Sequence, residues 1–188
     1  MNHEPFYVVK KNCVFIATSL DGYIADKQGG IEWLDLIPNT NHDDMGYFAF
    51  INEIDALVMG RASFETVLGF GIEWPYTKPV FVLSATLKSI PEDLADRVFH
   101  SHGTIPEILE RIHALGHFRL YIDGGKTISS FLREDLIDEM IITRIPILLG
   151  GGATLFGDLP QQLEFELISS KTYLHQITQH HYKRKRKA

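Results

Sequence analysis

Two adjacent glycines, Gly124 and Gly125, stand between an apolar segment and a run of helix-forming residues. The segment before them, 119–123 (RLYID), predicts a short strand, and the residues after them predict a helix. Glycine lets backbone N–H groups approach a ligand closely, and the N-terminus of a helix favours an anion. Lys126 could add a positive charge and Thr127 a hydroxyl. The junction is therefore a candidate phosphate site, with a tight turn that binds nothing as the alternative.

Two familiar phosphate-binding motifs do not fit this junction. A P-loop requires a glycine at position 120, where the chain has Leu120. The G-x-G-x-x-G fingerprint of dinucleotide-binding folds is also absent from residues 123–128. Both motifs are excluded by their spacing.

Two further strand ends carry groups that suit a phosphate. Gly60 is followed by Arg61 and Ser63, and another predicted strand ends at Ser84, two residues before Thr86. Arginine can donate two parallel hydrogen bonds to a phosphate through its planar guanidinium group. The alternative for Arg61 is an exposed ion pair with a nearby glutamate. Because ligands of open α/β sheets bind where strands end and helices begin, we expect the three junctions to belong to one site.

Asp44 is the candidate for proton chemistry. Residues 41–54 predict a helix, because their apolar side chains recur with helical spacing and Asn41 can cap the first turn. Asp43 and Asp44 would both lie in that turn, where a carboxylate stabilises the positive end of the helix dipole. A structural role and a role at a substrate are therefore both open for Asp44.

Short apolar runs alternate with helical segments along the whole chain, as in α/β folds. The predicted helices cover 41–54, 61–68, 104–115 and the segment from the glycine pair to about Arg133. The predicted strands cover 12–19, 56–60, 79–84, 97–100, 119–123 and 136–147, and a closing antiparallel pair covers 165–171 and 173–182. Three glycines at 150–152 interrupt the chain before that pair.

The composition predicts one globular domain over residues 1–182. The chain has 188 residues, 45% hydrophobic and 22% charged, which is ordinary for a folded domain. The N-terminus lacks the features of a signal peptide, and Cys13 is the only cysteine, so we expect a cytoplasmic protein. No apolar run is long enough to span a membrane. The nine histidines show no metal-ligand spacing, so we expect no metal.

The charge of the chain is unevenly distributed. Residues 183–187 are all Lys or Arg, and without these five the chain has 13 basic and 24 acidic residues, a formal charge of 13 − 24 = −11 instead of −6. So acidic a body argues against nucleic acid as a partner. We expect residues 183–188 to form a basic, disordered tail.

Four phrases of the sequence together resemble the dihydrofolate-reductase-like superfamily. They are LDGYIA at 20–25 (after Ala17), VMGRASFE at 58–65, VFVLS at 80–84, and IDGGK at 122–126, followed by Phe131 and Leu132. The phrase SLDG at 19–22 and the glycines at 150–152 resemble the riboflavin-biosynthesis branch more than true dihydrofolate reductases. The resemblance implies a three-layer α/β fold with a mostly parallel central sheet and an antiparallel C-terminal strand pair.

The resemblance also implies NADPH as the cofactor and roles for individual residues. Ala17 and Ile24 would hold the nicotinamide, while Gly60, Arg61 and Ser63 would face phosphates. Ser84 and Thr86 would line the side of the adenosine 2′-phosphate. Gly124, Gly125, Lys126 and Thr127 would hold the pyrophosphate, with a cis bond between the two glycines. Asp123 departs from the third glycine usual in true dihydrofolate reductases.

The resemblance gives Asp44 its second interpretation. In bacterial dihydrofolate reductases a pterin-binding carboxylate precedes the glycine of the Gly-Arg phrase by 16 residues, which is the separation of Asp44 and Gly60. Asp44 would then bind, and help protonate, a heterocycle between Phe48 and Trp33. The expected protein is a homodimeric, NADPH-dependent reductase of a pyrimidine- or pterin-like heterocycle, most like 5-amino-6-(5-phosphoribosylamino)uracil reductase. Dihydrofolate reduction, or nucleotide binding without catalysis, are the alternatives.

Overall fold

The computed structural model describes residues 9–186. In chain order the first elements are β1 (Lys11–Thr18), β2 (Tyr23–Ala25), the 3-10 helix η1 (Glu32–Leu36), α1 (Tyr47–Asn52), β3 (Ala56–Gly60), α2 (Arg61–Gly69), β4 (Val80–Leu83) and the 3-10 helix η2 (Glu92–Leu94). They are followed by β5 (Val98–Ser101), α3 (Ile105–Ala114), β6 (Arg119–Asp123), α4 (Gly125–Arg133), β7 (Glu139–Arg144), β8 (Ala153–Thr154), β9 (Phe165–Tyr173) and β10 (Ile177–Arg184).

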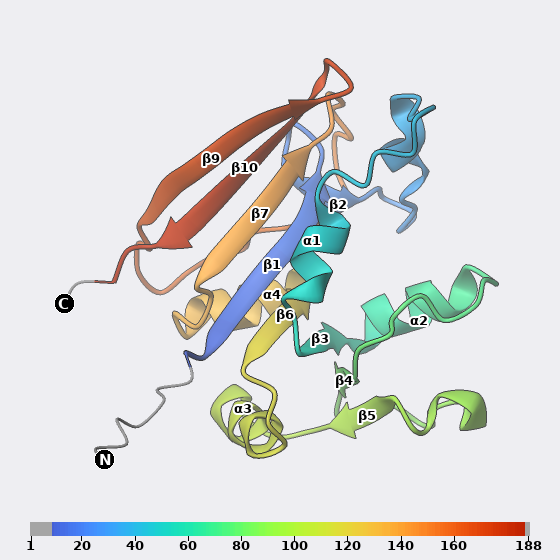
Figure 1. Ribbon diagram of the computed structural model, residues 1–188, viewed down its shortest axis with the longest axis vertical. Coiled ribbons are helices and arrows are strands. Elements are labelled where there is room, and N and C mark those ends of the chain that lie inside the picture. Colours follow the sequence, from blue (N-terminus) through green and yellow to red (C-terminus); the bar gives the residue numbers. More distant parts are fainter. Residues whose placement is uncertain (1–8, 187–188) are drawn as a thin grey trace, which may run out of the picture.

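An eight-stranded sheet lies at the centre of the molecule (Figure 1). Its strand order is β5-β4-β3-β6-β1-β7-β10-β9. The first six strands run parallel, and β10 and β9 add an antiparallel pair at one edge. A second, small sheet pairs β2 with β8. The mostly parallel sheet with antiparallel C-terminal strands is confirmed.

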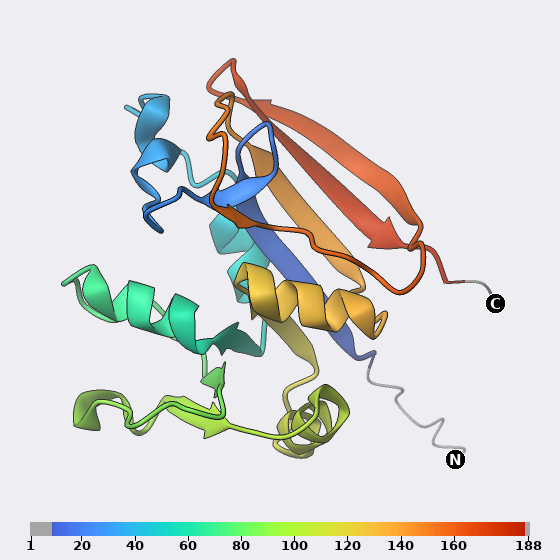
Figure 2. The same ribbon diagram turned by 180° about the vertical axis from the view of Figure 1, so that it is seen from behind.

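Helices cover both faces of the sheet, which gives three layers (Figures 1 and 2). On one face, Phe50 of α1 and Phe64 of α2 pack into a buried apolar cluster. On the other face, Ile112 of α3 and Phe131 of α4 belong to a second cluster. β3 and β6 lie between the two clusters, which is why their sequences are nearly continuous apolar runs. β9 forms an outer edge and is exposed over most of its length.

The predicted helix over 41–54 is wrong at its start. α1 begins only at Tyr47, because His42, Met45 and Gly46 have positive φ angles of 52°, 51° and 87°, which a right-handed helix cannot contain. The strand predicted over 136–147 is also shorter, with β7 covering only Glu139–Arg144. The other predicted helices and strands lie within a few residues of their observed positions.

Among residues 9–186, no helix is long and apolar enough to cross a membrane. Within the same residues, no group of three or more His, Cys, Asp or Glu side chains is placed to hold a metal ion. Cys13 is buried in β1, and its burial raises the pKa of the thiol to about 12, so the thiol is neutral at physiological pH.

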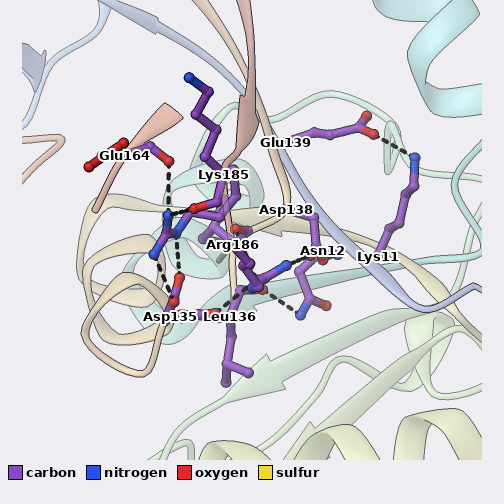
Figure 3. Close-up of polar contacts among 11 residues, drawn as sticks. Lys11, Asn12, Asp135, Leu136, Asp138, Glu139, Glu164, Lys185 and Arg186 are labelled. Atoms are coloured by element: carbon purple, nitrogen blue, oxygen red, sulfur yellow. Dashed lines mark hydrogen bonds and ion pairs between the residues drawn. The ribbon is translucent and has the colours of Figure 1, made fainter. Parts of the chain in front are cut away.

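The basic tail expected over 183–188 is wrong for the residues that the structure describes. β10 continues through Lys183 and Arg184, because the Arg184 guanidinium makes two hydrogen bonds to the Asp135 carboxylate, at 2.6 and 2.9 Å. Arg186 pairs with Asp138 next to this contact (Figure 3). Residues 187 and 188 lie outside the described residues. The cations that composition assigned to a disordered tail thus hold the last strand to the loop between α4 and β7.

We predict that the Arg184–Asp135 contact stabilises the fold. The Arg184 side chain is only 9% exposed, so Arg184→Met would leave the Asp135 carboxylate without its partner. The expected loss is about 1–3 kcal/mol of unfolding free energy in a urea titration. Arg186→Met is the matched control, because Arg186 is 45% exposed and should contribute less than about 1 kcal/mol. Equal losses in the two variants would contradict the assignment.

Candidate active site

The parallel register brings four strand ends to one edge of the sheet. Asp123 of β6 pairs with Met59 of β3, Met59 pairs with Val82 of β4, and Val82 pairs with His100 of β5. Neighbouring strands lie about 4.8 Å apart, so residues that leave one strand end are close to those that leave the next. The three junctions found in the sequence therefore meet at one edge, as a shared binding site requires.

The side chains of α2 and α4 meet across the glycines of this edge. A Cβ added at Gly60 would lie 3.0 Å from the Thr127 hydroxyl, and one added at Gly124 would collide with the Ser63 hydroxyl. Gly124 also has a φ of 88°, which disfavours every other residue. Two hydroxyls thus face bare backbone, as a site that holds an anion close to the chain requires.

Gly125 also cannot be replaced by a residue with a side chain, because neighbouring atoms occupy the place of a Cβ. A Cβ at this position would lie 2.8 Å from the Thr154 carbonyl oxygen of β8 and 2.9 Å from the terminal carbon of Ile24. The small β2–β8 sheet therefore packs directly onto the start of α4 and brings Ile24 to the glycine turn. The cis bond predicted between Gly124 and Gly125 is wrong, because residues 9–186 contain no cis peptide bond. The positive φ of Gly124 makes the turn instead.

The remaining predicted cofactor residues lie around this edge with their polar groups partly occupied. Arg61, in the first turn of α2, donates from Nη1 to Glu65 at 3.1 Å. This contact is the exposed ion pair that the sequence offered as the alternative to phosphate binding. The Ser84 hydroxyl accepts a hydrogen bond from the Thr86 backbone N–H at 2.9 Å. Lys126 is exposed at the start of α4. Ala17, near the end of β1, is half-buried.

Asp123, at the end of β6, is an acid that sequence reasoning treated only as a departure from glycine. The Tyr121 hydroxyl donates to the Phe15 carbonyl at 2.8 Å and also lies 3.2 Å from Asp123 Oδ1. Burial raises the pKa of Asp123, and hydrogen bonds from Tyr121, the Gly124 N–H and Ser63 offset only part of this effect. The signal in the sequence was an acid between a buried strand and two glycines.

Three tyrosines are grouped around this carboxyl. Burial and the charge of Asp123 raise the pKa of both Tyr47 and Tyr76. The same two causes raise the pKa of the fully buried Tyr121 hydroxyl. Tyr47 begins α1 and Tyr76 follows α2, so the group lies on the face of the sheet that these helices cover. The hydroxyls of Tyr47 and Tyr76 stay protonated and can donate hydrogen bonds to a ligand that faces Asp123.

The sequence matches the model of the RibD C-terminal domain over residues 11–178. The chain belongs to this family. It has the fold of dihydrofolate reductase, as the resemblance implied.

Three relatives show how far the likeness extends. The chain is 53% identical to a Shewanella sp. PV-4 protein named for riboflavin biosynthesis, with a TM-score of 0.91 over 94% of this chain and 99% of that one. It is 33% identical to the uncharacterised YwjB of Bacillus subtilis, over 93% of this chain and 98% of YwjB. Dihydrofolate reductase of Enterococcus faecalis, solved with NADP(H), shares the fold at 21% identity and a TM-score of 0.63, with coverage of 93% and 96%.

Trp33 and Phe48, two of the three residues predicted to bind the substrate, lie in different surroundings in this fold. Trp33 is 8% exposed and packs against Ile145 and Ile177 in a separate apolar cluster. Phe48 is 68% exposed. A cavity of about 320 Å³ lies between α1 and the strands β1, β7, β9 and β10, but none of the predicted site residues lines it.

Asp44 caps α1 instead of facing a ligand. Its Oδ2 accepts from the Phe48 N–H at 2.7 Å, and its Oδ1 accepts from the Gly46 N–H at 3.1 Å. These backbone hydrogen bonds lower the pKa of the carboxyl. Asp43 makes a different local contact, because it accepts from the Met45 N–H at 2.8 Å. The geometry thus favours the structural interpretation of Asp44.

We predict that Asp44→Asn leaves turnover within about twofold of wild type, whereas a substrate-binding or proton-donating carboxylate would cost about tenfold to a thousandfold. The contribution of Asp44 to stability should be present above the ordinary pKa of an aspartate and be lost as pH falls through its lowered folded-state value. Thermal melts of Asp44→Asn and the control Asp43→Asn, together with turnover, separate the roles. A large loss of turnover in Asp44→Asn alone would restore the catalytic role.

Proposed function

We propose that the chain is an NADPH-dependent reductase of a pyrimidine- or pterin-like heterocycle, most like 5-amino-6-(5-phosphoribosylamino)uracil reductase. The observation that carries the proposal is the edge of the sheet where Gly60, Gly124 and Asp123 meet. It combines bare backbone and hydroxyls, which suit a dinucleotide, with a half-buried acid of raised pKa beside them. Membership of the RibD C-terminal domain family supports the same reaction class.

The residues at this edge fit the cofactor. A Cβ at Gly124 would collide with the Ser63 hydroxyl, and one at Gly125 would lie 2.8 Å from the Thr154 carbonyl oxygen, so the two glycines let these groups approach the backbone at the start of α4. Thr127 would donate a hydrogen bond to the pyrophosphate, and Ile24 would pack against the nicotinamide. When bound, NADPH supplies the hydride, and the protein orients the reacting carbon and manages the proton.

Asp123 is the residue that we assign to the proton. Reduction of a carbon–nitrogen or carbon–oxygen double bond by hydride leaves a basic atom that must gain a proton. A carboxyl with a raised pKa stays protonated at higher pH than an exposed aspartate and can donate that proton. Tyr121 orients the carboxyl from the same strand. Dihydrofolate reduction is less well supported, because both oxygens of Asp44 are already bound to backbone N–H groups.

The experiment that tests the reaction class follows a deuteride from the cofactor. NADPH carrying deuterium at C4 is incubated with the protein and a set of pyrimidine, pterin and flavin-precursor heterocycles. The masses of the products are then measured by mass spectrometry. A reductase transfers one deuterium to a product carbon as NADPH is oxidised. Cofactor binding without transfer to any of these heterocycles would leave nucleotide binding as the function.

We predict that Asp123→Asn lowers turnover about tenfold to a thousandfold while the protein stays folded. Wild-type turnover should be highest below the raised pKa of Asp123 and decline as pH rises through it, and the Asn variant should lack this limb. The pKa is raised in the folded state, so the ionised carboxyl costs stability as pH rises. The melting temperature of Asp123→Asn at neutral pH should therefore equal or exceed that of wild type.

Tyr121→Phe is the matched control for this variant, because it removes the hydroxyl but keeps the acid. It should retain the pH-dependent limb that Asp123→Asn loses. An Asn variant with wild-type turnover and pH profile would remove Asp123 from the mechanism.

We also predict that Arg61→Ala weakens NADPH about tenfold to a hundredfold and NADH much less. One charge-assisted contact to a phosphate contributes about 1.5–3 kcal/mol, and only NADPH carries the 2′-phosphate. In wild type, Arg61 would exchange Glu65 for that phosphate. Dissociation constants for both cofactors, measured by fluorescence titration, check the prediction. Equal losses for the two cofactors would assign Arg61 to a phosphate that they share.

A further inference from the structure

Two tyrosines near Asp123 carry hydroxyl groups that the fold itself does not use. Tyr47 begins α1, and Tyr76 lies in the segment 70–79, which joins α2 to β4. Because α1 and α2 cover the same face of the sheet, both tyrosines approach Asp123 from that face (Figure 1). Of the three tyrosine hydroxyls around this carboxyl, only that of Tyr121 forms hydrogen bonds within the part of the chain that the structure describes.

A chain of contacts links Tyr47 to Asp123 from the side of α1. The Tyr47 ring meets the Phe15 ring edge-on, with 5.6 Å between the ring centres. The Phe15 carbonyl oxygen accepts a hydrogen bond from the Tyr121 hydroxyl at 2.8 Å. The same hydroxyl lies 3.2 Å from Asp123 Oδ1. Tyr47 therefore lies over β1, next to the end of β6.

A second chain of contacts reaches Asp123 from the side of α2. The Tyr76 ring meets the Trp74 ring edge-on, with 5.3 Å between the ring centres, and Trp74 meets Phe64 in the same way at 5.7 Å. The residue before Phe64 in α2 is Ser63, which forms a hydrogen bond with the Asp123 carboxyl. Trp74 and Tyr76 are both half-buried, so their packing holds the segment against α2. The carboxyl therefore lies between two groups of aromatic rings, one beside each helix.

The charge of Asp123 acts on both free hydroxyls. Burial raises the pKa of Tyr47 and of Tyr76, and the negative charge of Asp123 raises both pKa values further. Tyr47 acts on Tyr76 in the same direction. Because Coulomb interactions weaken with distance, the two hydroxyls lie near the carboxyl and near one another. Polar groups that are withdrawn from water are normally hydrogen-bonded, so two such hydroxyls without a protein partner are suited to a ligand.

Two neighbouring phenols are suited to an oxygen atom on the ring of a heterocycle. A protonated phenol donates one hydrogen bond, and a carbonyl oxygen has two lone pairs, so one ring oxygen can accept from both tyrosines. An amino group conjugated to a ring resembles the amide NH₂ group, which donates and does not accept. Such a group would suit the Asp123 carboxyl better than the two phenols.

We propose that Tyr47 and Tyr76 are specificity-determining residues whose hydroxyls bind a ring oxygen of the heterocycle that Asp123 faces. The inference rests on the proposed function. It adds to that function a preference for rings that carry oxo groups over rings that carry amino groups at the same positions.

The test compares two probes with oxo or amino groups at the same positions, pteridine-2,4-dione and pteridine-2,4-diamine. Their binding to the full chain, saturated with NADP⁺, is measured by calorimetry. Wild type should bind the dione about tenfold more tightly than the diamine, because each neutral hydrogen bond contributes about 0.5–1.5 kcal/mol.

Tyr47→Phe and Tyr76→Phe remove one hydroxyl each and keep the ring with its packing. Each variant should weaken the dione about threefold to tenfold and leave the diamine within about twofold of wild type. The double variant should bind the two probes equally. NADP⁺ should bind all three variants as tightly as wild type, which also shows that they are folded.

Tyr182→Phe is the matched control, because Tyr182 is a half-buried tyrosine of β10 that packs against the cluster on the other face of the sheet. It should bind both probes as wild type does. Equal losses of the dione and the diamine in the Tyr47 and Tyr76 variants would give the two rings a packing role and overturn the inference. A wild type that binds neither probe, or that prefers the diamine, would overturn it as well.

The deuteride experiment keeps this inference separate from the proposed function. Deuteride transfer by wild type, together with unchanged probe binding in the double variant, overturns this inference alone. If wild type transfers deuteride to none of the heterocycles, the proposed function fails, whatever the two probes show.

Discussion

The parallel register of β6, β3, β4 and β5 is the constraint on which the rest of the site depends. Parallel strands that share a register end at the same edge, so residues more than 60 positions apart in the chain meet there. The register in turn depends on strands that are buried on both faces and covered by helices. Gly60 and Gly124 then allow α2 and α4 to begin close together, with the hydroxyls of Ser63 and Thr127 facing bare backbone.

The burial of Asp123 connects this architecture to chemistry. An ionised carboxylate at the end of a buried strand costs free energy, because the protein replaces its hydration only in part. A fold that needed only a tight turn would be more stable with an uncharged residue at this position. In the proposed mechanism this carboxyl supplies the proton, and burial together with the charge of Asp123 keeps the hydroxyls of Tyr47, Tyr76 and Tyr121 protonated.

The sequence predicted the sheet and the glycine junctions well, because apolar runs that end in glycine carry a local signal. It failed where tertiary contacts decide. The predicted helix start at residue 41 was wrong, because the Asp44 carboxylate accepts a hydrogen bond from the first turn of a helix that begins later. The last strand extends to Arg184 because Arg184 binds Asp135, which is distant in the sequence and could not be identified from it. Trp33 was expected at the substrate but packs in the core, and Asp123 gains its raised pKa only through burial. The homodimer and the exclusion of nucleic acid stay predictions.

Hydrogen–deuterium exchange with and without NADPH tests the central claim most directly. The account predicts that the cofactor slows amide exchange at three separate segments at once, 60–63, 84–86 and 124–127, because they form one edge of the sheet. The cavity beside α1, lined in part by Phe50 and His181, should be unaffected. Protection confined to that cavity, or no protection at the three segments at saturating NADPH, would contradict the account.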